Sequence, residues 1–196
     1  MSFAHEHIRT FRKTELGLIL FVAILVSVVV YLLNFLIDPT FLFLGSLIVL
    51  VFGLNFLVHI IKKTGVVMLF FILISLFTLF INDIGIVGWK KIIVFLIAGL
   101  IFELSFLFLK IHVHNIPFDI VVGTSFSLLS IPLTTAFFLS PSLASSFPQS
   151  LLNVLSLAFV VGLITSVVAS LLWHHFEHSR LILKIESRLL NLNKKL

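Results

Sequence analysis

The sequence predicts an all-α integral membrane protein: a six-helix transmembrane bundle followed by a C-terminal amphipathic helix. Of its 196 residues, 60% are hydrophobic and only 11% are charged, whereas soluble domains are nearer half apolar and a quarter charged. A water-soluble fold of this size could not bury so much apolar surface. The mean hydropathy of +1.28 agrees, so most of the chain is expected to contact the lipid bilayer.

The membrane spans are predicted from uninterrupted apolar runs, because about 20 apolar residues cross a bilayer as a helix. Short polar or basic separators divide the runs. The six predicted spans are residues 16–37, 41–61, 65–82, 91–110, 119–140 and 151–173. We therefore expect a transmembrane domain over residues 1–175 and a separate tail helix over residues 176–196.

The orientation is predicted from lysine and arginine, which are enriched in cytoplasmic loops. With the N-terminus inside, only Lys90 and Lys91 face outward. The eleven residues expected at the cytoplasmic side are Arg9, Arg12, Lys13, Lys62, Lys63, Lys110, Arg180, Lys184, Arg188, Lys194 and Lys195. This asymmetry predicts a multi-pass protein of the cell (plasma) membrane with both termini cytoplasmic. It also accounts for the net charge of +5 without a nucleic-acid partner.

The tail carries an apolar stripe with heptad spacing. Its members are Ile182, Ile185, Leu189, Leu192 and Leu196. Basic residues beside such a stripe are typical of a helix lying on the inner leaflet. The alternative is that Ile182, Ile185 and Leu189 dock another subunit or a second copy of this chain.

Glu103 is a carboxylic acid inside an otherwise apolar span. Ionisable residues within the membrane are rare and usually face the bundle interior. Gly99, one turn earlier, would share its helix face. Two interpretations stay open: Glu103 anchors a solute or a proton, or it joins helices by a hydrogen bond. The polar fifth span, and Ser127 in particular, is its expected neighbour.

The outward rim is the surface richest in hydrogen-bonding groups. If a small-molecule solute binds from outside, Asn34, Asn82 and Asn153 are expected to fix its orientation. Trp89 would stack on it and Lys90 would attract an anionic group. Glu103 and Ser127 complete the predicted substrate-binding residues.

Several classes of protein are excluded or disfavoured. The chain has no cysteine, which excludes disulfides, thiolate zinc sites and iron–sulfur ligation. Its histidines are expected at the membrane boundary without a metal, and no cofactor is expected. No nucleotide-binding motif appears, and no pair of catalytic groups shares one depth, so an enzyme is not expected.

Three features carry a resemblance to a known family: "RKTELGLILFVAILVSVVV" in the first span, "VFLIAGLIFEL" in the fourth, and the length with its six spans. The chain resembles the S components of energy-coupling factor transporters, the membrane subunits that capture vitamins and other micronutrients. The resemblance implies partners, namely a transmembrane coupling subunit and ATPases. It also implies a small-x-x-x-small docking face on the first helix, where Ala23 and Ser27 have that spacing.

The expected function is therefore a membrane-embedded substrate-binding subunit for uptake of a small, vitamin-like solute, driven by a separate ATP-dependent coupling module. The alternative is a structural or interaction membrane protein that binds no solute. Such a protein would assemble with itself or with a larger membrane complex.

Overall fold

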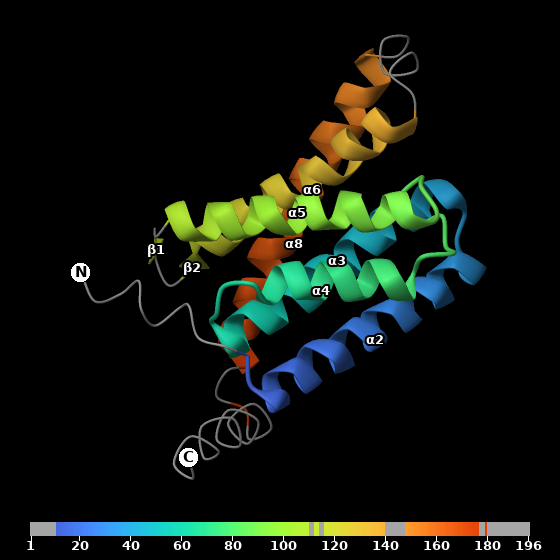
Figure 1. Cartoon of the computed structure of the whole chain (residues 1–196). Helices are drawn as coiled ribbons and strands as arrows, with labels where there is room; N and C mark the ends of the chain where they lie inside the picture. Colours follow the sequence, from blue (N-terminus) through green and yellow to red (C-terminus); the bar gives the residue numbers. More distant parts are fainter. Residues whose placement is uncertain (1–10, 110–111, 114–115, 140–147, 177–178, 180–196) are drawn as a thin grey trace.

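The structure, a computed structural model, describes residues 11–109, 112–113, 116–139, 148–176 and 179. Its elements are α2 (Lys13–Leu36), α3 (Pro39–Ile61), α4 (Val66–Phe77), α5 (Trp89–Phe108), β1 (His112–Val113), β2 (Ile116–Pro117), α6 (Phe118–Leu139) and α8 (Pro148–Phe176). The two short strands pair antiparallel. The described part of the chain is otherwise built from helices (Figure 1).

Five helices are long and apolar enough to cross a membrane, which confirms the prediction of a multi-pass membrane protein. They are Lys13–Leu36, Phe41–Ile61, Trp89–Phe108, Phe118–Phe138 and Leu151–Phe176. The heptad residues Ile182, Ile185 and Leu189 lie outside the described residues, so the amphipathic tail stays a prediction.

The third predicted span, residues 65–82, is the place where the structure differs. Only 12 of its residues form a helix, α4, and at 1.5 Å per residue α4 is about 18 Å long. The hydrocarbon core of a bilayer is about 30 Å thick. The prediction of six full spans is therefore not confirmed, and α4 is a short helix held inside the bundle.

Gly65 is the N-cap of α4, and two further glycines lie in the loop that follows the helix. Gly65 has a φ of +88° directly before the helix, and Gly85 and Gly88 have φ of +83° and +80° in the loop after it. Residues with side chains rarely adopt this left-handed region, whereas glycine does so readily. The loop packs against the protein, since Ile81, Ile84 and Ile86 are buried.

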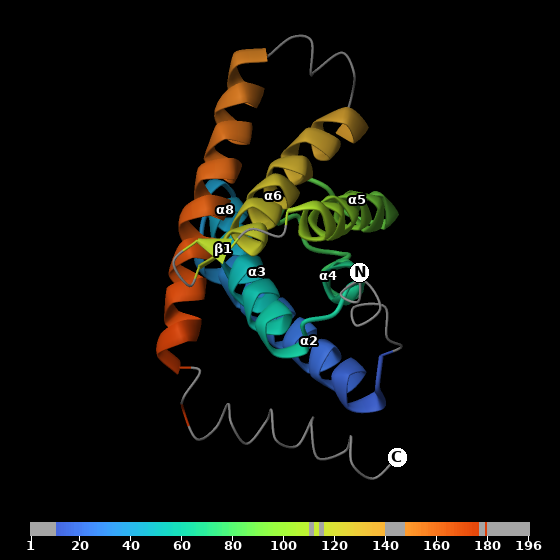
Figure 2. The same ribbon diagram turned by 90° about the vertical axis from the view of Figure 1, so that its left-hand side faces the viewer.

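The helices form one packed bundle. Figure 1 shows α5, α4 and α2 side by side in that order, and α4 contacts both of its neighbours. The helices α6 and α8 pack against each other, and α8 also packs along α3 (Figure 2). We call the end of the bundle that contains Lys13 and Phe176 the terminal end, and the end that contains Leu36 and Trp89 the far end.

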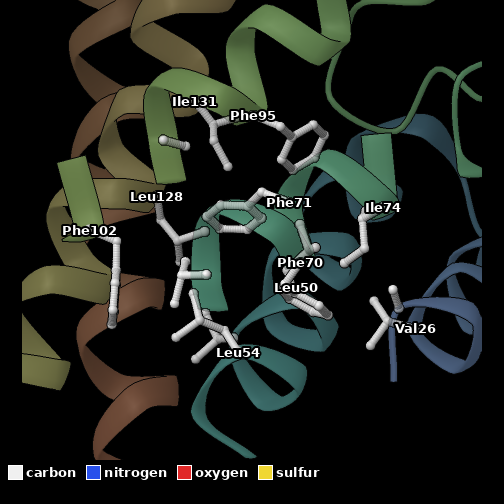
Figure 3. Packing of buried hydrophobic residues seen from close by; sticks show 14 of the residues in the cluster. Val26, Leu50, Leu54, Phe70, Phe71, Ile74, Phe95, Phe102, Leu128 and Ile131 are labelled. Atoms are coloured by element: carbon white, nitrogen blue, oxygen red, sulfur yellow. The ribbon is translucent and has the colours of Figure 1, made fainter. Parts of the chain in front are cut away.

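The core lies between α2, α3, α4, α5 and α6. Phe70 and Phe71 of α4 are fully buried, and the ring of Phe71 lies 5.5 Å from that of Phe95 (Figure 3). Gly99 lets α5 approach α4 closely, because a Cβ atom there would lie 3.0 Å from the Cα of Met68. In proteins, Cβ atoms rarely lie so close to an atom of another residue, so a glycine at position 99 is needed where α5 crosses α4.

Candidate functional site

Glu103 holds the N-terminus of α4. Its Oε1 accepts a hydrogen bond from the backbone N–H of Val67, at 3.1 Å. The first N–H groups of a helix lack partners within the helix, and the helix dipole makes this end favourable for a negative charge. The contact agrees with the helix-joining interpretation of Glu103, but its partner is α4 and not Ser127 of the fifth predicted span, which bonds to Ala98.

Lys91 holds the opposite end of the same helix. It is fully buried, and its Nζ donates to the carbonyls of Thr78, at 2.7 Å, and Ile81, at 3.1 Å. It also pairs with the carboxylate of Asp83. An ammonium group has three N–H donors, so these contacts use all of them, and its charge complements the C-terminal end of the dipole.

The two contacts together make α5 a clamp for α4. Lys91 and Glu103 are twelve residues apart on α5, or about 18 Å, which matches the length of α4. The helices run antiparallel, so each charge meets the dipole end that it stabilises. Burial raises the pKa of the Asp83 carboxyl, while the neighbouring Lys91 ammonium opposes that change.

Other polar side chains within the spans also form contacts between or within helices. Ser127 Oγ of α6 donates to the carbonyl of Ala98 on α5, at 2.8 Å. Thr124 and Thr134 donate to carbonyls of their own helix, each at 2.7 Å. Ser127, predicted as a substrate-binding residue, therefore serves as a contact between α5 and α6 in this structure.

Asn55 joins α3 to α8. It is buried, its Nδ2 donates to the carbonyl of Val51 at 3.0 Å, and its Oδ1 lies 3.4 Å from Ser166 Oγ and 3.5 Å from Ser170 Oγ. Such contacts between spans contribute roughly 0.6 kcal/mol on average. Sequence reasoning missed Asn55, although a lone amide in the middle of an apolar span was a visible signal.

An ion pair closes the terminal end between α2 and the loop that follows α3. Lys63 Nζ lies 2.7 Å from both carboxylate oxygens of Glu15. One of those oxygens also accepts from the backbone N–H of Arg12, at 2.9 Å. The lysine and the carboxylate are both mostly shielded from solvent, so this pair fixes the entry of α2 into the bundle.

The solute-binding residues predicted at the outward rim are exposed, whereas Lys91, which was also predicted to face outward, is fully buried. The exposed residues are Asn34, Asn82, Trp89, Lys90 and Asn153, and they come from α2, the loop after α4, α5 and α8. Asp83 and Lys91, which are close to these positions in the sequence, are buried and form an ion pair. The predicted set of solute-binding residues thus divides into exposed rim positions and two residues, Glu103 and Ser127, that connect helices.

The small-residue face of α2 points into the bundle. Ala23 is 0% exposed and Ser27 is 4% exposed, on a helix that packs against α3 and α4. In this structure the face is therefore covered by the chain itself and offers no surface to a coupling subunit. The spacing identified a packing face, but it could not identify the packing partner.

An apolar groove lies between α2, α3 and α8. Its volume is about 520 Å³. It opens sideways, since several of its lining side chains are exposed, including Phe21 at 62% and Leu25 at 51%. The lining residues are Phe21, Val22, Leu25, Val26, Val49, Phe52, Gly53, Asn55, Phe56, Ala169, Leu172, Trp173 and Phe176.

An aromatic rim borders the groove toward the terminal end. The ring of Trp173 lies 5.3 Å from that of His59 and 5.9 Å, edge to face, from that of Phe56. The Nδ1 of His59 lies 2.8 Å from the carbonyl oxygen of Asn55. Sequence reasoning missed the groove, because its lining has the same residue types as any lipid-facing helix surface.

No protein-family model, curated protein or solved structure matches this chain. Within the described ranges, no group of three or more His, Asp or Glu residues could hold a metal ion. The function therefore has to be argued from the geometry of the bundle.

Proposed function

We propose that the chain is a membrane-embedded binding subunit for a small solute, and that the solute is apolar and enters the groove from the bilayer. The observation that carries the proposal is the groove itself. Its volume of about 520 Å³ falls within the range of roughly 300–1,000 Å³ that is usual for ligand pockets. The proposal keeps the substrate-binding function expected from the sequence and places the site on another face.

The lining supports an apolar rather than a polar solute. Asn55 supplies the carboxamide of the groove, and that amide already contacts Val51, Ser166 and Ser170. A polar group that leaves water without a new partner loses roughly 2–7 kcal/mol. A vitamin-like solute with many polar groups would incur this free-energy cost for each group that lacks a partner in the groove.

Uptake driven by ATP would need partners. The sequence carries no nucleotide-binding motif of its own, so a transmembrane coupling subunit and ATPases would supply the energy. Because Ala23 and Ser27 are buried, the coupling subunit would bind a different surface of the bundle.

The proposal is tested by mass spectrometry of small molecules retained by gently purified protein. Leu25→Trp with Leu172→Trp would fill the groove, because both leucines line it. Leu20→Trp with Leu171→Trp is the matched control, since those leucines are also exposed on α2 and α8 but lie outside the lining. We expect an apolar molecule with the native protein and the control, and its loss from the filled variant. Equal retention by all three would exclude the groove as the site.

The alternative, an interaction protein without a solute, is favoured by a different observation. The C-terminal end of α6 and the N-terminal end of α8 extend beyond the other helices at the top of the view (Figure 1). Apolar side chains are exposed there, including Phe137 at 73% and Leu152 at 63%. Native mass spectrometry that finds a second copy or another protein bound, with no small molecule, would support assembly instead of solute binding.

A further inference from the structure

Two connections at the far end of the bundle expose large apolar side chains. They are the turn between α2 and α3, residues 37–38, and the loop between α4 and α5, residues 78–88, and both lie at the right of the view in Figure 1. Phe80 is 86% exposed and Phe35 is 82% exposed. We call the exposed apolar residues in and beside the two connections the far-end face; they are Phe35, Leu36, Phe41, Phe80, Val87 and Trp89. A group of exposed apolar side chains of this kind marks a contact with a membrane or with another protein.

The far-end face lies at the level of a membrane boundary. The helix α5 has 20 residues and is therefore about 30 Å long, which equals the thickness of the hydrocarbon core. When α5 crosses the core, its first residue, Trp89, lies at one boundary. The loop returns to that level, since the N–H of Gly88 donates to the carbonyl of Leu79, the neighbour of Phe80, at 2.9 Å. Phe80 and Trp89 are thus both within reach of the acyl chains.

The far-end face is continuous with the lipid-facing surface of α2. The hydroxyl of Tyr31 donates to the carbonyl of Phe77, the last residue of α4, at 3.3 Å, so the ends of α2 and α4 lie side by side. Val28 and Leu32 are exposed on α2, which is long and apolar enough to cross a membrane. Phe35 follows them at helical spacing on the same face. The surface that contacts lipid along α2 therefore extends without a break to the connections at the far end.

The charged groups of the α4–α5 loop are arranged as a lipid environment requires. Asp83 and Lys91 are buried and pair with each other, and Lys91 also donates to two backbone carbonyls. Charged groups at membrane depth pair in these two ways. The exposed Lys90 is next to Trp89 at the start of α5, where a lysine can keep its methylene groups among apolar chains and extend its ammonium toward lipid phosphates.

We infer that the far-end face is inserted into the membrane interface and is covered by phospholipid. Phe80 and Trp89 lie among the outer parts of the acyl chains, where aromatic side chains are enriched in membrane proteins, and Lys90 lies at the phosphates. Exposed polar side chains of the same end meet the hydrated headgroups; they are Asn34, Asp38 and Asn82. The far-end face contributes no residue to the groove, so the inference is independent of the proposed function.

Trp89 is a native reporter of this face, because the chain has two tryptophans and Trp173→Phe leaves Trp89 alone. A second reporter is Phe80→Trp in a chain that also carries Trp89→Phe and Trp173→Phe. The matched control is Leu163→Trp in that same background, since Leu163 is exposed near the middle of α8. Circular dichroism verifies that each full chain is folded.

Each chain is placed in vesicles of phosphatidylcholine brominated either near the headgroup or near the end of the acyl chain, since bromine quenches tryptophan at contact. Iodide in the buffer measures exposure to water. We expect both far-end reporters to be quenched several-fold more by the bromine near the headgroup than by the deep bromine, and the control at position 163 to show the reverse. Iodide should quench the far-end reporters several-fold less than it quenches free tryptophan.

Two results would overturn the inference. If iodide quenches the far-end reporters strongly and neither brominated lipid does, while the control is quenched by the deep bromine, the far end faces water. If the far-end reporters are protected from iodide and from both lipids, protein covers the face, either a second copy of this chain or another subunit. Both results would leave the proposed function of the groove standing, because it rests on other residues.

Discussion

Replacing Glu103 tests the clamp on α4 most directly. In Glu103→Leu the backbone N–H of Val67 loses its hydrogen-bond partner. Water cannot readily replace that partner, because Val67 is only 1% exposed. A buried donor left unsatisfied costs about 1–3 kcal/mol, and the lost interaction of a charge with a helix end adds about 0.3–1 kcal/mol. We therefore expect the free energy of unfolding to fall by about 1.3–4 kcal/mol. Glu103→Gln keeps an acceptor and should cost about 1 kcal/mol.

The assay is thermal unfolding in nanodiscs, followed by circular dichroism. For a chain of this size, 1 kcal/mol shifts the Tm by about 2–4 °C, so Glu103→Leu should lower the Tm by roughly 3–16 °C. Hydrogen exchange should accelerate at the first amides of α4 and stay unchanged in α8. Leu104→Ala, which removes an exposed apolar side chain from the neighbouring position, is the control and should change the Tm little.

One result would refute this reasoning. If Glu103→Leu were as stable as the native protein, or more stable, the carboxyl would be an unfavourable lipid-facing group rather than a cap for α4. If instead Glu103→Gln left the Tm unchanged but abolished ligand binding, the charge or the proton of Glu103 would be used in function.

Two further predictions follow from the structure, and a third concerns the topology predicted from the sequence. Lys91→Met should cost about 3–5 kcal/mol, because it leaves the partner carboxylate buried and uncompensated; a denaturation midpoint equal to that of the native protein would contradict the buried ion pair. Gly99→Ala should lower the Tm, because overpacking costs about 1–3 kcal/mol, whereas Gly17→Ala, with no atom within 4 Å of the added Cβ, should raise it slightly through helix propensity. Cysteines introduced singly at Ser142 and Ser187 are predicted to lie on opposite sides of the membrane. In intact cells an impermeant reagent should label only the cysteine at position 142, and the cysteine at position 187 should react only after the cells are opened. Labelling of both in intact cells would contradict the predicted topology.

Much of the fold could be predicted from the sequence, because it depends on properties that are summed along the chain. The length and hydropathy of the apolar runs predicted six membrane-spanning helices, and the structure contains five helices that are long and apolar enough to cross a membrane. The high cost of a lipid-exposed carboxylate also predicted that Glu103 contacts the protein, as its bond to Val67 shows. Hydropathy alone, however, did not reveal that α4 begins after Gly65, ends at Phe77 and has only 12 residues.

The candidate site was decided by the tertiary structure alone. In lipid, the inward and outward faces of a helix can carry the same apolar residues, so periodicity does not tell which way Ala23 and Ser27 point. The structure turns them inward and leaves Phe21 and Leu25 beside a groove that needs three helices to exist. The sequence also did not reveal that Lys91 and Glu103 contact opposite ends of α4. These contacts depend on the antiparallel packing of α4 and α5. In a bilayer, apolar side chains are stable both in the protein interior and at the lipid-facing surface. The buried surface of this protein is therefore recognised only by its packed polar groups and small residues, and these contacts are known only from the tertiary structure.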